Sequence, residues 1–261
     1  MRLNHARAKS TLKRTFDFLI ALIALTLLAP LFALIAAAIW LDDGKSPFFL
    51  ARRVARGGGD FRMVKFRTMI SDAWKSGVHS TALGDPRITR LGQWLRKAKL
   101  DELPQLWNVL TGDMSLVGPR PQVRAGVELY TAEESALLEA RPGITDPASI
   151  VFADEGEILA GSADPDLLYN QIVRPWKSRL GLLYVKNASL ARDLHVLLLT
   201  AIALVSRPRA LRAVTLLIDS LGADEKLKAV ASRELPLEAF PPPGAQKIVQ
   251  RYRPREARAH A

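Results

Sequence analysis

The longest apolar pattern in this chain is a run of 24 uncharged residues, from Phe18 to Leu41. As a helix this run would be about 36 Å long, which is enough to cross a bilayer. Pro30 lies near its middle, and a proline removes one intrahelical hydrogen bond and kinks a helix. Basic residues flank both ends of the run, so the positive-inside rule gives no clear orientation. They are Arg7, Lys9, Lys13 and Arg14 before the run and Lys45, Arg52, Arg53 and Arg56 after it.

These features predict a re-entrant membrane helix over residues 15–41, which enters and leaves at one face of the membrane. A basic N-terminal segment, residues 1–14, precedes it. A kinked helix that crosses once is the alternative, because membrane helices tolerate proline. A cleaved signal peptide is disfavoured, since the run is too long and no small-residue cleavage site is evident.

Beyond the apolar run, alternating apolar and polar positions predict two short strands at residues 48–54 and 61–69, joined by a glycine-rich turn at residues 56–60. The alternation puts Lys65 and Arg67 on one face of the second strand. A lysine and an arginine side by side could hold a diphosphate, the arginine through its planar fork and the lysine as a point charge.

Helical spacing begins again at Leu103, and Leu106, Trp107 and Leu110 continue it. Pro104 suits the first turn of such a helix, and Gly112 can end it. Just upstream, apolar and basic residues alternate irregularly over residues 94–100, which indicates an amphipathic helix. That helix could lie at a membrane interface or pack against the domain, and the two alternatives stay open.

The C-terminal half carries weaker patterns. Helices are predicted at residues 133–139, 190–205 and 210–221, the last of them amphipathic. The segment after residue 221 is charged and contains a run of three prolines, so it is predicted to be mostly disordered.

The charge is unevenly distributed. The net charge is +11, and residues 45–99 hold thirteen basic residues against three aspartates. Such a field attracts phosphates, anionic lipid headgroups or nucleic acid. Nucleic acid is the least favoured partner, because no helix-turn-helix, zinc-finger or stacking-aromatic pattern accompanies the charge. The chain has no cysteine, and His5, His79, His195 and His260 lack ligand spacing, so disulfides and zinc are disfavoured.

The candidate chemistry lies in Asp101 and Glu102, two adjacent carboxylates that follow a basic run at the predicted start of a helix. An aspartate kept ionised beside a phosphate is a plausible nucleophile, and a second carboxylate next to it could hold Mg²⁺. The alternative is an ordinary helix cap followed by an acidic residue that matches the helix dipole.

Three segments, in order, resemble the bacterial sugar transferase family, the monotopic phosphoglycosyl transferases. The resemblance covers roughly residues 13–200. The segments are Lys65-Phe66-Arg67-Thr68-Met69, Asp85-Pro86-Arg87-Ile88-Thr89-Arg90-Leu91-Gly92, and residues 100–121, which begin Leu100-Asp101-Glu102-Leu103-Pro104 and end Gly118-Pro119-Arg120-Pro121.

The resemblance implies roles for individual residues. Asp101 would attack the sugar-bearing phosphorus, Glu102 would bind Mg²⁺, and Lys65, Arg96 and Arg120 would neutralise phosphate charge. Arg67 is a candidate substrate contact from the strand alternation alone. The resemblance places the segment of Arg87 and Arg90 near the active site, so these two are either substrate contacts or plain surface charge. The family's membrane helix breaks at a Ser-Pro pair, for which this chain has Ala29 and Pro30.

The fold implied is α+β and mostly helical, with the re-entrant helix, a small cytoplasmic α/β catalytic domain at residues 42–206, interfacial amphipathic helices, and a tail at residues 207–261. The activity implied is transfer of a sugar 1-phosphate from a nucleoside diphosphate sugar, such as a UDP-sugar, to polyprenyl (undecaprenyl) phosphate, with release of UMP. The location implied is the cytoplasmic face of the bacterial inner membrane, and the product would start O-antigen, capsule or exopolysaccharide synthesis.

Two departures from the family pattern limit the resemblance. After Pro142-Gly143-Ile144-Thr145 the chain continues Asp146-Pro147-Ala148-Ser149 and then the acidic Asp154-Glu155-Gly156-Glu157, so sugar recognition does not carry over. Gly181 stands where many members have aspartate. A non-catalytic, membrane-bound polybasic protein that binds anionic lipid or an assembly partner is the competing hypothesis. The oligomeric state is open, a homodimer being one alternative.

Overall fold

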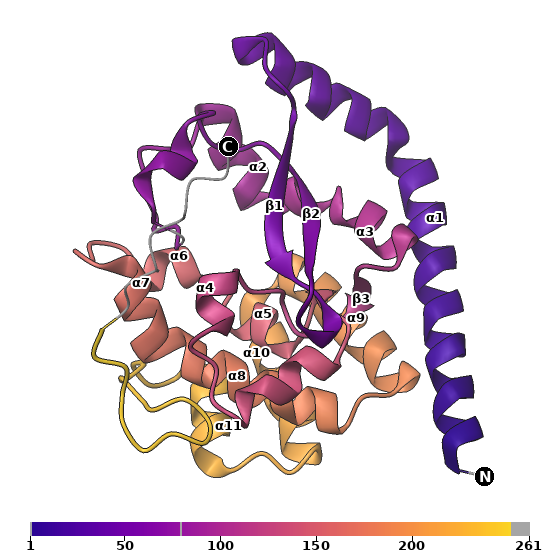
Figure 1. Cartoon of the computed structure of the whole chain (residues 1–261), viewed down its shortest axis with the longest axis vertical. Coiled ribbons are helices and arrows are strands. Elements are labelled where there is room, and N and C mark those ends of the chain that lie inside the picture. The colour runs from indigo at the N-terminus through magenta and orange to yellow at the C-terminus, as the bar shows by residue number, and fades with distance from the viewer. Residues whose placement is uncertain (1, 79, 252–261) are drawn as a thin grey trace.

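The structure, a computed structural model, describes residues 2–78 and 80–251, without the side chains of residues 2–10 and 74 (Figure 1). His79, His260 and the last ten residues of the predicted tail lie outside the described residues. The prediction of a mostly helical α+β fold is confirmed: helices surround two small sheets, and one long helix, α1, runs along the side of the molecule (Figure 1).

Helix α1 (Arg2–Asp43) is continuous through Ala29 and Pro30. It curves across the top of the molecule (Figure 1), so the predicted break is a bend within one helix. A proline in a helix interior removes only one hydrogen bond, which a curved helix tolerates. From Thr11 to Asp43 the helix is long and apolar enough to cross a membrane by length and composition.

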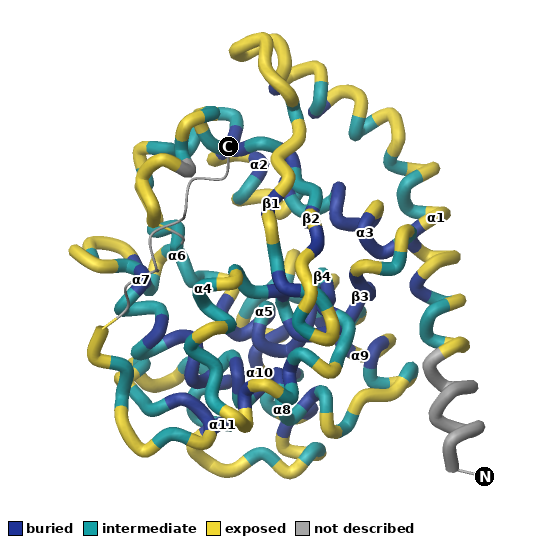
Figure 2. Tube along the Cα trace, in the orientation of Figure 1, coloured by how far each residue is buried: buried dark blue, intermediate teal, exposed yellow. Residues whose placement is uncertain are grey.

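One side of α1 packs against the rest of the protein. Ala21 is buried in the main core, whereas Ile35 and Ile39 form a second cluster with Phe66 and Leu95. The opposite side is apolar and exposed, as the yellow stretches of Figure 2 show. Its large exposed side chains include Ile23, Leu27, Leu34 and Leu41.

Polar contacts tie both ends of the apolar part of α1 to the same body. Near its start, Lys13 pairs with Asp193 at 2.5 Å, and the Asp17 carboxylate accepts a hydrogen bond from Ser115 Oγ at 2.8 Å. At the end of α1, Asp43 forms a bidentate ion pair with Arg67. The apolar segment therefore starts and finishes against one folded unit.

Strands β1 (Phe48–Val54) and β2 (Asp60–Phe66) form an antiparallel hairpin through the turn η1 (Arg56–Gly58), which confirms the predicted pair of strands. The second strand is shorter than predicted and ends at Phe66. Beyond it, Met69 makes only an isolated bridge with Ile88. The alternation that grouped Arg67 with Lys65 therefore stops one residue before Arg67.

A second, parallel pair joins β3 (Ser115–Val117) to β4 (Gly143–Thr145). At the end of β3 and the start of β4 the two backbone segments approach so closely that only glycine fits. A Cβ on Gly143 would lie 2.1 Å from the backbone nitrogen of Gly118, and one on Gly118 would lie 2.3 Å from the carbonyl oxygen of Arg141.

The helices from α2 onward are mostly short. The α-helices are α2 (Arg90–Lys97), α3 (Gln105–Thr111), α4 (Arg124–Val127), α5 (Pro147–Val151), α6 (Glu155–Ile158), α7 (Pro165–Leu168), α8 (Arg174–Lys186), α9 (Leu190–Val205), α10 (Arg207–Ser220) and α11 (Glu225–Ser232). The 3-10 helices are η2 (Ala73–Ser76), η3 (Leu100–Glu102) and η4 (Glu134–Glu139), and η5 (Tyr169–Val173) is a π-helix. The main core lies among α5, α8, α9 and α10, where Figure 2 is darkest.

Helix α2 packs on the domain, which is one of the two alternatives for the segment at residues 94–100, and the membrane-interface alternative stays a prediction. Leu95 is buried against α1, whereas Trp94 is 73 % exposed between the exposed basic residues Arg90 and Lys97. One face thus packs on the domain, and the other presents an aromatic side chain among cations.

The prediction of a mostly disordered segment after residue 221 is wrong for the part that the structure describes. Helix α11 buries Leu227 and Ala231, and the ring of Phe240 stacks on Trp176 of α8 at 4.6 Å between centroids. Scattered apolar residues are enough to hold this proline-rich segment, because each meets a site on α8 or its neighbours. Composition alone does not reveal such docking.

Candidate functional site

The two adjacent carboxylates sit on the single turn η3, between α2 and α3. Lys99 adopts a left-handed conformation, with φ of 56°, and separates η3 from α2. Pro104 is the N-cap residue of α3, and Gly112 ends that helix with φ of 98°, as predicted. Asp101 therefore lies in a turn before α3, not in the first turn of α3 itself, and the predicted benefit from the helix dipole is not how the site is built.

Glu102 is held by two cations. Its Oε1 accepts from Lys65 Nζ at 2.9 Å and from Arg120 Nη2, and its Oε2 accepts from Arg120 Nη1 at 3.0 Å. Burial alone would raise the pKa of Glu102, but Arg120 and Lys65 outweigh it and hold that pKa well below its usual value. Glu102 therefore stays ionised at neutral pH.

Asp101 is different, although it is the next residue. Its side chain is buried, with 7 % exposed, and no hydrogen bond or ion pair from the described residues reaches its carboxylate. Burial and the Glu102 charge raise its pKa above the usual value, and Lys65, Arg96 and Arg120 offset this only in part. The predicted strong preference of Asp101 for the ionised form is therefore not what its surroundings favour. Of the two carboxylates, Asp101 is the one available to react with a ligand.

Arg96 and Arg53 complete the cationic surroundings. Arg96, on α2, donates to Thr68 Oγ1 at 2.8 Å and acts electrostatically on Asp101. Burial and the neighbouring Arg120 lower the pKa of Arg53 to about 10. The sequence analysis took Arg53 only as a flank of the membrane segment. The register of the β1–β2 hairpin would have identified Arg53 as a site residue. Arg53 lies opposite Phe61, on the hairpin face that carries Lys65.

Of the predicted site residues, the structure brings together Asp101, Glu102, Lys65, Arg96 and Arg120, which come from η3, β2, α2 and the segment after β3. Asn108 helps to hold them, since its side chain accepts from Val64 N at 2.8 Å and donates to the Arg62 carbonyl at 2.8 Å. These bonds tie α3 to the strand that carries Lys65.

Three predicted substrate contacts lie elsewhere. Arg67 is bound to Asp43 at the end of α1. Arg87 is held within its own turn by Asp85, by Ser76 Oγ at 2.6 Å and by the Val78 carbonyl at 3.0 Å. Arg90 is exposed at the start of α2. The structure thus gives Arg67 and Arg87 structural partners and leaves Arg90 on the surface.

The donor set suits Mg²⁺ only with help from a ligand. The described residues hold no group of three or more His, Cys, Asp or Glu side chains that could bind a metal. Asp101 and Glu102 offer two carboxylates, and Glu102 Oε2 accepts one hydrogen bond from the described part of the chain. Mg²⁺ ordinarily takes one or two carboxylates and completes its octahedral shell with phosphate oxygens and water, so the pair fits that pattern when a phosphate is bound.

The two departures from the family pattern have structural places. Asp146 is buried and caps α5, where its carboxylate accepts from Ser149 N at 2.7 Å. Gly181 lies inside α8, and a Cβ there would be 3.0 Å from Leu137 Cδ2. Leu137 thus fills the space that a longer side chain at position 181 would need.

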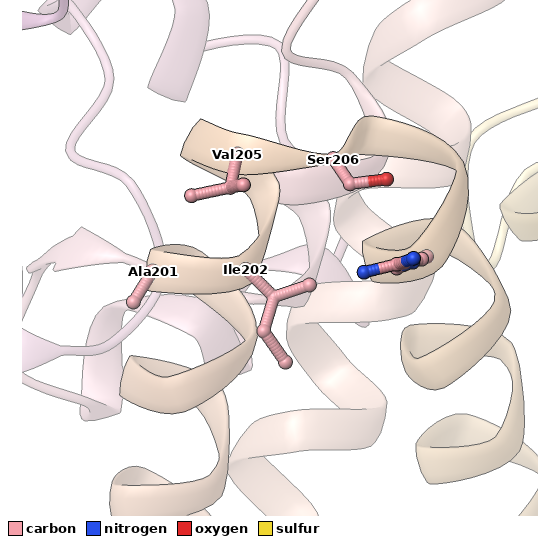
Figure 3. Close-up of a pocket in the computed structure, with 5 residues that line it drawn as sticks. Ala201, Ile202, Val205 and Ser206 are labelled. Carbon is pink, nitrogen blue, oxygen red and sulfur yellow. The ribbon is translucent and has the colours of Figure 1, made fainter.

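A shallow hollow of about 450 Å³ lies away from this site, at the corner between α9 and α10. Ala201, Ile202, Val205 and Ser206 line it (Figure 3), and none of the predicted site residues does.

The site thus consists of a buried, unpaired carboxylate beside a second carboxylate that two cations hold, in a folded unit that packs against a helix long and apolar enough to cross a membrane. The profile described as "Bacterial sugar transferase" matches residues 8–207, and the chain belongs to that family.

Curated proteins similar to this chain include two sugar phosphate transferases and an exopolysaccharide production protein. The chain is 37 % identical over 201 residues to the "UDP-glucose:undecaprenyl-phosphate glucose-1-phosphate transferase" of Caulobacter vibrioides, covering 76 % of this chain and 71 % of that protein. It is 43 % identical over 148 residues to the "Exopolysaccharide production protein ExoY" of Rhizobium meliloti, covering 51 % and 66 %. It is 37 % identical over 192 residues to the "UDP-N-acetylgalactosamine-undecaprenyl-phosphate N-acetylgalactosaminephosphotransferase" of Aeromonas hydrophila, covering 72 % of this chain but only 42 % of that relative.

Proposed function

We propose that this chain is a polyprenyl-phosphate sugar phosphotransferase. It moves a sugar 1-phosphate from a UDP-sugar to undecaprenyl phosphate and releases UMP, at the cytoplasmic face of the inner membrane. The observation that carries the proposal is the unpaired, buried Asp101 beside a Glu102 that Lys65 and Arg120 hold. The names of the relatives support the acceptor and the class of reaction.

Asp101 acts as the nucleophile. One of its carboxylate oxygens attacks the phosphorus that bears the sugar, the bond from that phosphorus to the bridging oxygen breaks, and UMP leaves with the bond electrons. A phosphate oxygen of undecaprenyl phosphate then attacks the same phosphorus and releases the Asp101 carboxylate. The product is a lipid-linked sugar diphosphate, and all atoms and charges balance over the two steps.

The cations supply charge stabilisation. Arg120 and Lys65 already converge on the Glu102 carboxylate, and Arg96 acts electrostatically on Asp101, so phosphate oxygens that bind beside the two carboxylates meet several positive charges. Mg²⁺ held by Glu102 and the donor diphosphate would neutralise the charge that develops on the departing UMP.

The first prediction concerns the order of events. With a UDP-sugar and Mg²⁺ but no lipid acceptor, UMP should appear in a burst of at most one equivalent per enzyme. The intact protein should gain the mass of a sugar phosphate, because the first step does not need the acceptor. Rapid-quench mass spectrometry measures both quantities, and EDTA should suppress both.

A direct transfer would give unmodified protein and UMP only when acceptor is present, and that result would refute the two-step mechanism. A non-catalytic polybasic protein would bind anionic vesicles and release no UMP under any of these conditions. The same measurements therefore separate the proposed enzyme from the competing hypothesis.

We also propose that α1 is re-entrant. The contacts Lys13–Asp193 and Asp43–Arg67 tie both ends of the apolar segment to one folded unit, and a helix that crossed the bilayer would carry those ends to opposite sides. The exposed apolar side of α1 would then lie in the cytoplasmic leaflet, with the exposed Trp94 of α2 at headgroup depth.

The second prediction tests this topology. Single cysteines at Ser10 and Ser46 should both be protected from a membrane-impermeant thiol reagent in intact cells, and the chain has no native cysteine to interfere. Adding Pro30→Ala restores a hydrogen bond and straightens the helix, so part of the population should span the membrane and expose position 10. Labelling of Ser10→Cys with Pro30 still present would rule out re-entry.

A further inference from the structure

The acidic segment that departs from the family pattern lies next to the candidate site. Its Glu155, on α6, forms an ion pair with Lys177 of α8. The Lys177 side chain is 14 % exposed, and its ammonium lies 5.6 Å from the ring centre of Tyr169 and 5.9 Å from that of Phe152. Glu155 is 31 % exposed and Tyr169 is partly buried, so a carboxylate, an ammonium and an aromatic ring lie together at a place that solvent partly reaches.

This group adjoins Arg120. Gln122 follows Arg120 by two residues and donates from Nε2 to the Tyr169 hydroxyl at 3.2 Å. Burial lowers the pKa of Arg120, but Glu102 and, to a smaller extent, Glu155 more than offset this and raise that pKa. Arg120 therefore lies within electrostatic range of both carboxylates, and the Gln122–Tyr169 hydrogen bond joins the segment that carries Arg120 to the π-helix that carries Tyr169.

The backbone holds these side chains firmly. Tyr169 begins the π-helix η5, which leads into α8, and such π-turns often occur at functional positions because they re-aim a side chain. Behind Glu155, Asp154 pairs with Arg207 at 2.7 Å and with Arg233 at 2.8 Å. Gly156 accepts from Leu83 N at 2.7 Å. Arg233 lies beyond the matched family region, so the C-terminal segment helps to fix the acidic loop.

The side chains of Glu155, Lys177 and Tyr169 together indicate which kind of ligand they can bind. The Glu155–Lys177 pair carries no net charge, so it does not favour a phosphate as Arg120 and Lys65 do. A carboxylate and an ammonium side by side suit neighbouring hydroxyls, since one accepts and the other donates, and an aromatic ring packs on the C–H face of a pyranose. In the proposed reaction the sugar is joined through its anomeric oxygen to the phosphorus that Asp101 attacks, so it must lie close to Arg120.

We propose that Glu155, Lys177, Tyr169 and Gln122 bind the hexosyl group of the nucleotide sugar and set which sugar is accepted. The inference rests on the proposed function. It also accounts for the position of the sequence departure: the named relatives use different sugars, glucose in one and N-acetylgalactosamine in another, and the acidic segment contacts the part of the donor that differs.

The test compares donors. The full chain, reconstituted in nanodiscs with undecaprenyl phosphate, is assayed for UMP release with UDP-glucose, UDP-galactose, UDP-N-acetylglucosamine and UDP-N-acetylgalactosamine. Glu155→Gln and Lys177→Met should each lower kcat/KM for the best donor by about 10- to 100-fold and change the ratio between donors by about tenfold or more, because a lost hydroxyl contact discriminates between sugars. Glu157→Gln, an exposed carboxylate on the same helix, is the matched control and should leave both unchanged.

Two further readouts make the outcome decisive. The inhibition constant of UMP should stay the same in both variants, because UMP lacks the sugar. A large change in it would assign the group to the nucleotide and overturn the proposal, as would unchanged donor ratios. Thermal melting identifies a variant that misfolds. In that case Glu155→Asp replaces Glu155→Gln, or Lys177→Arg replaces Lys177→Met, and the ratio of kcat/KM between donors should again change. If the unaltered chain releases UMP from no donor, the proposed function itself has failed.

Discussion

Asp101→Asn should abolish UMP release, with a loss of at least about 1,000-fold, equivalent to about 4 kcal/mol of activation free energy. The amide is nearly the same size as the carboxylate but cannot attack phosphorus. The structure adds a reason to expect an intact fold: no hydrogen bond or ion pair from the described residues depends on the Asp101 carboxylate. Burial of a neutral amide there is also less costly than burial of a charge.

The measurement is UMP release by purified protein in nanodiscs, together with its melting temperature and its recovery in the membrane fraction. Asp72→Asn makes the same chemical change at a carboxylate that is 67 % exposed, and it should keep full activity. If Asp101→Asn retained more than about a tenth of the activity, the nucleophile would have to be another group. The adduct seen by mass spectrometry should disappear in the same variant.

The largest effect on stability is expected from Arg174→Met. Glu134 is fully buried, and Arg174 pairs with both of its oxygens, with Nε at 3.0 Å from Oε1 and Nη2 at 2.5 Å from Oε2. Removing the guanidinium leaves a buried carboxylate with Ser178 Oγ and Thr131 N as its remaining donors. An uncompensated buried charge of this kind costs about 3–5 kcal/mol of unfolding free energy.

Thermal unfolding followed by circular dichroism would show this as a drop in melting temperature of roughly 10 °C or more. Lys186→Met, at an exposed position on the same helix, is the matched control and should change the melting temperature little. The double variant Arg174→Met with Glu134→Leu should recover part of the loss, because no charge is then left unpaired. Equal melting temperatures for Arg174→Met and the control would show that the pair contributes little.

Neither Glu134 nor Arg174 was a candidate in the sequence analysis. They are 40 residues apart, and no local pattern marks either of them for pairing. Their pairing depends on η4 packing against α8, and no local pattern encodes that contact. The same limit applies to the Glu155–Lys177 pair, whose members are joined only when α6 and α8 meet.

Local chemistry was sufficient where neighbours along the chain make the structure. The apolar run of α1, the alternation of β1 and β2, and the stop at Gly112 all follow from steric and solvation preferences within a few residues. The acidic pair was also recognised from the chain alone, because Asp101 and Glu102 are adjacent and their surrounding motif is long.

Packing between distant segments settled the rest. Two neighbouring carboxylates have opposite surroundings because Lys65 and Arg120, from two other elements, reach Glu102 and not Asp101. Arg67, one residue past the end of β2, turns to Asp43 instead of the site, and the last described segment is held by Trp176 and Asp154. Residue type limits what a side chain can do, whereas burial and the partner it meets determine which of those things it does.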